Sequence, residues 1–355
     1  MSRLSVAALH TPFHVRMAAR NLANAWVRRG AFTVPAHFGE PAQEALAARV
    51  SAVLADSTPY ARLRVHGAGA ARLLSAACGV DLAALATGEG RPVHWMNEAG
   101  GVRGLGVAGR FGETNFVLGA FDADRGWFET FAPRFGARVR DETLEKGLLL
   151  LLGPYAPAIL TAAGLSGAAE LPLWRHAIYD WRGITVEVSR WSRLGGFRIA
   201  SSAEDGVAVF DRLAAAGEKF ALMLAGQDAL ELLYLEAGFP LAGFDFQPAR
   251  ADGAPEPAAI SFGVEPAKDN APVLAGLEWE SGPPAPFAPL FVGGQEVGRT
   301  LRSAYSPALR RNIALANLRP AHAAPGSEVE IPVAGARDGR AARARVAQLP
   351  FLKFG

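Results

Sequence analysis

Residues 147–160 read GLLLLLGPYAPAIL, and this stretch decides the class of fold. A run of leucines enclosed by two glycines has the length of a buried β-strand and is far too short to cross a bilayer. The glycine that follows ends the strand, and Pro154 is well tolerated at the start of a helix. A buried strand that leads directly into a helix indicates a fold that mixes α and β elements.

The same mixture extends in both directions from this stretch. We expect strands near 136–141 and 147–152, and helices in RGWFETFAPRF, GVAVFDRLAAAG and QDALELLYLEAG, because apolar residues recur there at helical spacing. Nearer the amino terminus, the pattern predicts a helix over residues 17–28 and a second one from Pro41 to about residue 54. Two successive α+β units of comparable order indicate an internal duplication.

The composition changes between residues 247 and 289, where proline, glycine and alanine become frequent. Short strand-like segments separated by turns follow, as in a small barrel or sandwich. We therefore expect an amino-terminal helical segment at 1–50, an α+β domain of two related units at 51–250, a linker at 251–285 and a β domain at 286–355.

Composition and charge exclude several classes of protein. The chain has 355 residues with 36 basic and 34 acidic side chains, and this balance argues against nucleic acid as a partner. A single cysteine, Cys78, rules out an internal disulfide framework and fits a reducing compartment. The first residues lack the apolar core of a signal peptide. We expect a soluble, cytoplasmic protein with no membrane partner.

Five motifs in the chain stand in an order that is similar to the glycine-cleavage T protein and its folate-binding aminomethyltransferase-like relatives. These motifs are LADSTPYARLRVHGAGAARLL, GRPVHWMNEAGGVRGLGV, LLLLLGPYAPAIL, YLEAGFPLAGFDF and VGGQEVGRTLRSAYSPALRRNIALANL. The resemblance implies an α+β fold with three lobes, in which two related α+β units form a folate-binding pair beside a carboxyl-terminal β-barrel-like domain. It also implies tetrahydrofolate as the cofactor, with N5 accepting a one-carbon unit near an acidic side chain.

Several positions depart from the family pattern. Gly104 and Leu105 stand where relatives commonly carry an acid, and Arg198 replaces a glutamate that contacts folate in the T protein. Tyr234 replaces an arginine, and the loop before Arg198 is shortened. These departures argue against true aminomethyl transfer and bring the chain closer to the tetrahydrofolate-dependent O-demethylases.

The resemblance also points to individual site residues. It assigns cofactor binding to Tyr60, Met96, Asn97, Arg190, Glu236 and Tyr305, while His94, Tyr60 and Tyr305 are the candidate catalytic residues that replace the missing acid. Structural alternatives stay open at four of these positions. Tyr60 fits a half-buried strand tyrosine, Glu236 a solvated residue at a helix end, His94 a merely hydrogen-bonded histidine, and Arg190 a surface arginine. No histidine pair has metal-ligand spacing, so no metal site is expected.

The function implied is a tetrahydrofolate-dependent methyl (one-carbon) transferase or demethylase. Its donor would be a small O-, S- or N-methyl compound, from which the methyl group moves to N5 of tetrahydrofolate. The alternatives are a non-catalytic folate-binding or assembly protein and a one-carbon-accepting subunit beside a partner oxidase. The expected partners are therefore a small-molecule methyl donor and a second protein subunit.

Overall fold

The computed structural model describes residues 8–97, 101–192, 194–246, 248, 272–282, 285–332 and 341–353. These residues form two compact units. Unit 1 holds the described residues up to 93 together with 106–230, and unit 2 holds those of 94–105 together with those from 231 on. In the described part of the chain, no helix is both long enough and apolar enough to cross a membrane.

The amino-terminal part of unit 1 contains less helix than the sequence predicts. Helix α1 covers only His14–Ala18, and strand β2 follows at Trp26–Arg29, so the predicted helix over 17–28 is wrong. The Asn21 side chain explains the break, because it accepts a hydrogen bond from the N–H of Ala25 and donates one to the Ala25 carbonyl. Such local bonding by asparagine competes with helix formation.

The next elements of unit 1 are a small sheet and a helix. Strands β1 (Leu9–His10) and β3 (Phe32–Pro35) pair with each other, and β3 also pairs with β2. The helix predicted from Pro41 is confirmed as α2, Pro41–Val50. It ends earlier than expected because the chain enters strand β4 at Val53.

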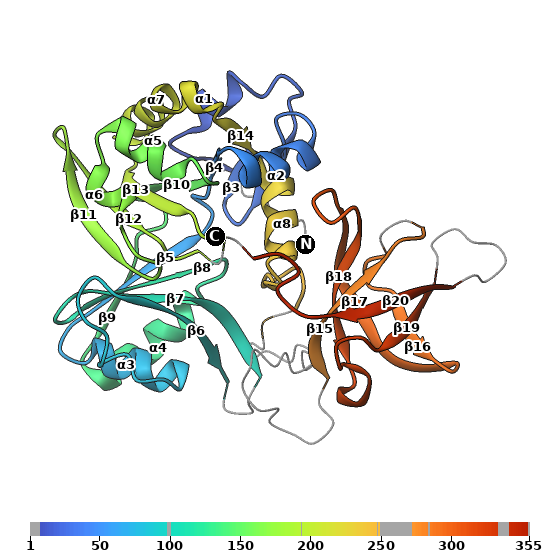
Figure 1. The fold of residues 1–355 in the computed structure, drawn as a ribbon. Coiled ribbons are helices and arrows are strands. Elements are labelled where there is room, and N and C mark those ends of the chain that lie inside the picture. The colour runs from blue at the N-terminus through green and yellow to red at the C-terminus, as the bar shows by residue number, and fades with distance from the viewer. Residues whose placement is uncertain are drawn as a thin grey trace, which may run out of the picture. The chain divides into compact units, whose positions relative to one another are not determined.

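A six-stranded sheet forms the first lobe of unit 1, in the order β11-β12-β13-β10-β4-β14. The predicted leucine strand is its central strand β10, and its leucines are buried on both faces. Helices α5 and α7 cover one face of this sheet (Figure 1). The bounds are β4 Val53–Asp56, β10 Lys146–Leu152, α5 Ala156–Ala163, α6 Ser166–Ala169, β11 His176–Trp181, β12 Ile184–Ser189, β13 Phe197–Ser202, α7 Gly206–Gly217, η1 Glu218–Phe220, β14 Met223–Ala225 and α8 Gln227–Glu236.

A five-stranded sheet forms the second lobe, in the order β6-β7-β8-β5-β9. Helices α3 and α4 lie on its outer face, away from the six-stranded sheet (Figure 1). An ion pair between Arg62 of β5 and Glu187 of β12 joins the inner faces of the two sheets within unit 1. The bounds are β5 Ala61–His66, α3 Ala70–Cys78, β6 Gly90–Met96, β7 Val102–Gly112, β8 Asn115–Ala120, α4 Arg125–Phe135 and β9 Arg138–Asp141.

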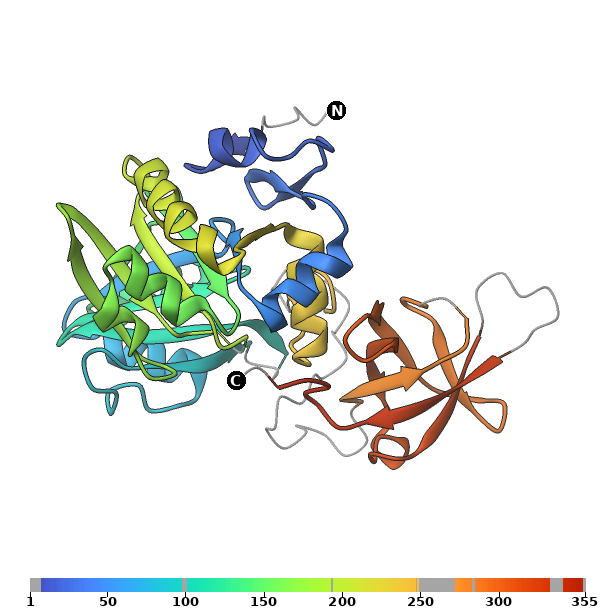
Figure 2. The same cartoon turned by 45° about the horizontal axis from the view of Figure 1, so that its top comes forward.

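The carboxyl-terminal part of unit 2 is a closed barrel in the order β15-β18-β17-β16-β19-β20 (Figure 2). Its first strand lies inside the stretch predicted as a linker at 251–285, so the barrel begins earlier than the turn density indicated. Alternate residues of this strand, VLAGLEW, enter the barrel core. The bounds are β15 Val273–Trp279, β16 Pro289–Val292, β17 Gln295–Ser306, β18 Arg311–Leu318, η2 Pro320–His322, β19 Glu328–Pro332 and β20 Ala341–Ala347.

The fold class predicted from the sequence is confirmed. Two sheet-and-helix lobes precede a closed β-barrel, and the fold is α+β with three lobes. Residues 251–271 of the predicted linker lie outside the described part of the chain.

The leucines of β10 should dominate the stability of unit 1. Leu151 is fully buried in the core between the six-stranded sheet and its helices, whereas Leu144 is 61% exposed. We expect Leu151→Ala to lower the free energy of unfolding by about 2–5 kcal/mol, because it leaves a cavity, and Leu144→Ala to change it by less than about 0.5 kcal/mol. Urea denaturation of the two variants checks this, and similar midpoints would contradict it.

Candidate functional site

Unit 1 has a pocket between its two sheets, which we call the inter-sheet pocket. Its cavity volume is about 30 Å³, which holds one or two water molecules but lies far below the roughly 300 Å³ or more of a typical ligand site. Its walls come from both sheets and are mostly aromatic or charged. They comprise Tyr60, Arg62, Phe111, Val117, Gly119, Leu148, His176, Glu187, Val188, Ser189, Trp191, Arg198 and Ala200.

The strand pattern explains why charged side chains enter this pocket. In β5, Leu63 and Val65 are buried beneath the sheet, so Arg62 and Arg64 lie together on its other face. Glu187 is the one charged residue of strand β12 and faces them. The pocket therefore receives Arg62 and Glu187 from two strands that are far apart in the sequence.

These charges form a buried network that joins the sheets. Arg62 donates from Nε to Oε2 of Glu142 at 3.0 Å and also binds Glu187. Arg64 donates from Nη2 to Oε2 of Glu142 at 3.0 Å, and Nζ of Lys146 lies 3.2 Å from Oε1 of Glu187. Burial acts to raise the pKa of Glu142, but the hydrogen bond from Arg64 and the charges of both arginines outweigh it and hold that pKa below its ordinary value.

His176 is the titratable ring of the pocket. It stacks on Phe111 with ring centroids 3.9 Å apart and meets the edge of Trp191 at 4.8 Å. Burial lowers the pKa of His176 to about 4, although the charge of Glu187 acts in the opposite direction. Among the described residues, none hydrogen-bonds to its buried Nδ1. The ring is thus neutral at pH 7, with one nitrogen available to a water molecule or a ligand.

Tyr60 and Arg198 close the pocket from opposite sheets. The hydroxyl of Tyr60 donates to the carbonyl of Gly119 at 2.8 Å, and the guanidinium carbon of Arg198 lies 3.8 Å from the centroid of the Tyr60 ring. A Cβ atom on Gly119 would lie 2.6 Å from Cε1 of Tyr60. Only glycine at position 119 therefore leaves room for the phenol ring.

Two of the predicted site residues, Tyr60 and Arg190, belong to unit 1. Tyr60 lines the inter-sheet pocket, whereas Arg190 does not. Arg190 donates to the carbonyls of Leu171 and Gly195, both at 3.1 Å, and its guanidinium lies over the ring of Phe197. These contacts fix the loop between β12 and β13, so the side chain is built into the structure and is not a surface arginine.

The other predicted residues belong to unit 2. Glu236, at the end of α8, is 1% exposed and accepts a 2.6 Å hydrogen bond from the hydroxyl of Ser306 on β17, so the alternative of a solvated helix end is wrong. The side-chain oxygen of Asn97 accepts a hydrogen bond from the N–H of Gly101. The remaining three are Met96 and Tyr305, which are exposed, and His94, which is half-buried with a pKa lowered by burial.

Sequence reasoning missed the charged part of the pocket. It did not single out Arg62, His176 or Glu187, although a lone glutamate in the apolar strand ITVEVS was an available signal. The two carboxylates that bind Arg62 stand 80 and 125 positions away from it along the chain. In the described residues, no three side chains of the metal-ligating types His, Cys, Asp and Glu come together.

The buried ring of His176 should make stability depend on pH. Its pKa lies near 6.5 when the chain is unfolded and near 4 when it is folded, so the unfolded state binds the proton first as the pH falls. Stability is therefore lost between these two values. We expect the wild type to lose about 2 kcal/mol relative to His176→Phe between pH 7 and pH 5, measured by urea denaturation. Parallel pH profiles for the two proteins would contradict this.

Comparison with known proteins covers nearly the whole chain. Residues 14–265 match the GCVT N-terminal domain, and residues 273–353 match the glycine cleavage T-protein C-terminal barrel domain. The aminomethyltransferase of Symbiobacterium thermophilum is 30% identical over 371 residues, covering 96% of this chain and 95% of that protein. The aminomethyltransferase of Streptomyces coelicolor is 28% identical, with 90% and 91% covered.

A solved structure has the same fold. It is the glycine cleavage system aminomethyltransferase T from Bartonella henselae, with a TM-score of 0.83, 24% identity and 98% of each chain covered. Both lobes and the barrel thus agree in sequence and in architecture. The chain belongs to the glycine-cleavage T protein (aminomethyltransferase) family.

Proposed function

We propose that this protein moves a methyl group from a small O-, S- or N-methyl donor to N5 of tetrahydrofolate, and does not release an aminomethyl group from a lipoyl protein. Glycine-cleavage T proteins bind tetrahydrofolate as their substrate-cofactor, and the family consists of transferases. Family membership supports one-carbon transfer in general. The choice of a methyl donor rests on one observation in unit 2.

That observation is the packing at Gly104 and Leu105, where the family resemblance places an acid. A Cβ atom on Gly104 would lie 2.1 Å from Cζ2 of the fully buried Trp95. Leu105 packs in an apolar cluster with Val102 and Phe246. A carboxylate therefore has no room at position 104 and no solvation at position 105.

Among these donors, the absent acid favours O- and S-methyl compounds over N-methyl ones. A leaving amine must gain a proton, whereas a leaving phenolate or thiolate needs only hydrogen bonds. His94 is neutral at pH 7 because burial lowers its pKa, and the hydroxyl of Tyr305 is accessible on a side chain that is 52% exposed. We propose these two side chains as donors of a hydrogen bond to the departing atom.

The inter-sheet pocket does not fit a pterin ring as it is folded. Its cavity is too small, its Tyr60 hydroxyl is bonded to Gly119, and Arg198 covers the Tyr60 ring. Glu236 is likewise bonded to Ser306. We therefore assign tetrahydrofolate no contact within the inter-sheet pocket.

Turnover assays with a panel of donors test the proposed function directly. The purified protein is incubated with tetrahydrofolate and methoxyarenes, methylated sulfur compounds or methylated amines, and 5-methyltetrahydrofolate is measured by mass spectrometry. We expect product from an oxygen or sulfur donor and none from an aminomethyl-lipoyl protein. Folate binding without product from any donor would support the non-catalytic alternative, and aminomethyl transfer would overturn the proposal.

The packing that carries this proposal can be tested by stability alone. We expect Gly104→Ala to lower the free energy of unfolding by about 1–3 kcal/mol, because the new methyl group meets Trp95. In a Trp95→Leu background the same substitution should cost less by about 0.5 kcal/mol or more. Gly112→Ala is the matched control, since its Cβ atom would have an ordinary 3.6 Å contact. Equal costs in both backgrounds would show that Trp95 does not exclude a side chain there.

A further inference from the structure

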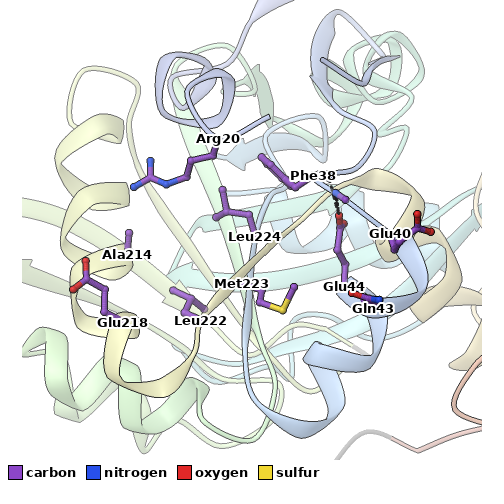
Figure 3. Close-up of a pocket in the computed structure, with 11 residues that line it drawn as sticks. Arg20, Phe38, Glu40, Gln43, Glu44, Ala214, Glu218, Leu222, Met223 and Leu224 are labelled. Carbon is purple, nitrogen blue, oxygen red and sulfur yellow. Dashed lines mark hydrogen bonds between the residues drawn. The ribbon is translucent and has the colours of Figure 1, made fainter. Parts of the chain in front are cut away.

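A second hollow of unit 1 lies along the edge strand β14, and we call it the β14 groove (Figure 3). Its volume of about 480 Å³ falls in the range of ligand sites. It shares no residue with the inter-sheet pocket. The groove is lined by Arg20, Phe38, Gly39, Glu40, Gln43, Glu44, Ala214, Glu218, Leu222, Met223 and Leu224.

The backbone of β14 is available to a further strand. β14 pairs with β4 and is the last strand of its sheet, so its other side has no strand partner in the described part of the chain. The N–H of Met223 donates to the Ala52 carbonyl on the β4 side. Because successive residues of a strand direct their polar groups to opposite sides, the N–H and C=O of Leu224 point away from β4. Exposed edges of this kind are templates for pairing with another chain.

The side chains of the edge do not protect it. Natural edge strands are protected by shortness or by lysine, proline or a bulge; this one is only three residues long, but it reads Met-Leu-Ala and leaves Met223 41% exposed. Leu222, Leu224 and Phe38 continue the apolar surface beside it. An occupant would therefore bury apolar area as well as pair its backbone.

The charge of the groove selects the kind of occupant. Glu40 and Glu218 are exposed and lie on opposite sides of β14 (Figure 3). Glu44 is buried, and its carboxylate accepts from the N–H groups of Phe38, Gly39 and Gly226, which fixes it beneath the groove. Arg20 is the one cation in the lining. The excess of carboxylates favours a positively charged ligand.

We propose that the β14 groove binds an extended, lysine- or arginine-bearing segment of a partner protein, which adds as a strand to the edge of β14. Main-chain hydrogen bonds to Leu224 give such a segment its register, and Glu40 and Glu218 select its basic side chains. Phe38 and Met223 contact its apolar side chains. The proposal is independent of the proposed function because no residue of that site takes part in it.

Peptide probes separate the backbone requirement from the charge requirement. Acetyl-Lys-Val-Lys-Val-Lys-amide is titrated into the full-length protein by isothermal calorimetry at low salt. Three matched probes are used: the Glu-Val-Glu-Val-Glu peptide, and two N-methylated forms of the lysine peptide that together block alternate amides in both registers. We expect the lysine peptide to bind saturably and the glutamate and N-methylated peptides not to bind. Binding of the lysine peptide should weaken as added salt screens the charges.

Charge-reversal variants place the binding in this groove. We expect Glu40→Lys/Glu218→Lys to weaken binding of the lysine peptide by about tenfold or more, because like charges then face each other. Glu280→Lys in unit 2 is the control, since Glu280 is exposed and does not line the groove. No saturable binding, equal binding of the N-methylated peptides or an unchanged affinity of the double variant would overturn the proposal. A dimer in sedimentation that the double variant or Met223→Lys abolishes would instead assign the edge to a second copy of this chain.

Discussion

The ion pair between Arg62 and Glu187 is the interaction on which the architecture of unit 1 depends. It joins a strand of the five-stranded sheet to a strand of the six-stranded sheet, and Glu142 and Lys146 complete the network on either side. Removal of one partner from a buried pair leaves an uncompensated charge, at a cost of about 3–5 kcal/mol. Because the pair spans the space between the sheets, it also fixes how far apart they stand and how little room the pocket has.

Glycines beneath aromatic rings also limit the size of the inter-sheet pocket. The indole of Trp191 lies over two glycines of the neighbouring sheet, since a Cβ atom on Gly90 or on Gly109 would fall 2.6 Å or 2.1 Å from it. Tyr60 uses Gly119 in the same way. Interiors are packed like crystals, so each missing methyl group is matched by a ring that enters its space. The pocket is small because the aromatic side chains have taken the room that the glycines leave.

The sequence predicts those elements of the fold that depend on interactions between residues close together along the chain. The leucine strand β10 and the helix from Pro41 depend on local apolar periodicity and were predicted closely. The helix over 17–28 failed because one side chain, Asn21, bonds its own backbone and stops it. Strand β15 was assigned to the linker because proline-rich residues precede it. Periodicity and turn density already indicated two α+β units and a β domain, and the family resemblance grouped them as three lobes.

The inter-sheet pocket could not be predicted from the sequence for a different reason. In the sequence, Arg62 is indistinguishable from an ordinary strand arginine, because its partners Glu142 and Glu187 stand 80 and 125 positions away. The pKa of His176 likewise depends on Phe111 and Trp191, which no local pattern connects to it. Predicting such a site requires the pairing of the strands, and strand pairing is long-range information.

The register of two neighbouring strands shows how a shared fold can change its chemistry. Ser189 of β12 is opposite Arg198 of β13, and Glu187 is opposite Ala200, so Glu187 and Arg198 face the same side of the sheet. The family resemblance places a glutamate of the T protein at position 198. In this lining the carboxylate comes instead from Glu187 and is neutralised by Arg62 and Lys146. The arginine keeps the alternation of inward and outward residues that holds the strand in place. A change of charge on one face therefore alters what the pocket can bind without disturbing the apolar core on the other.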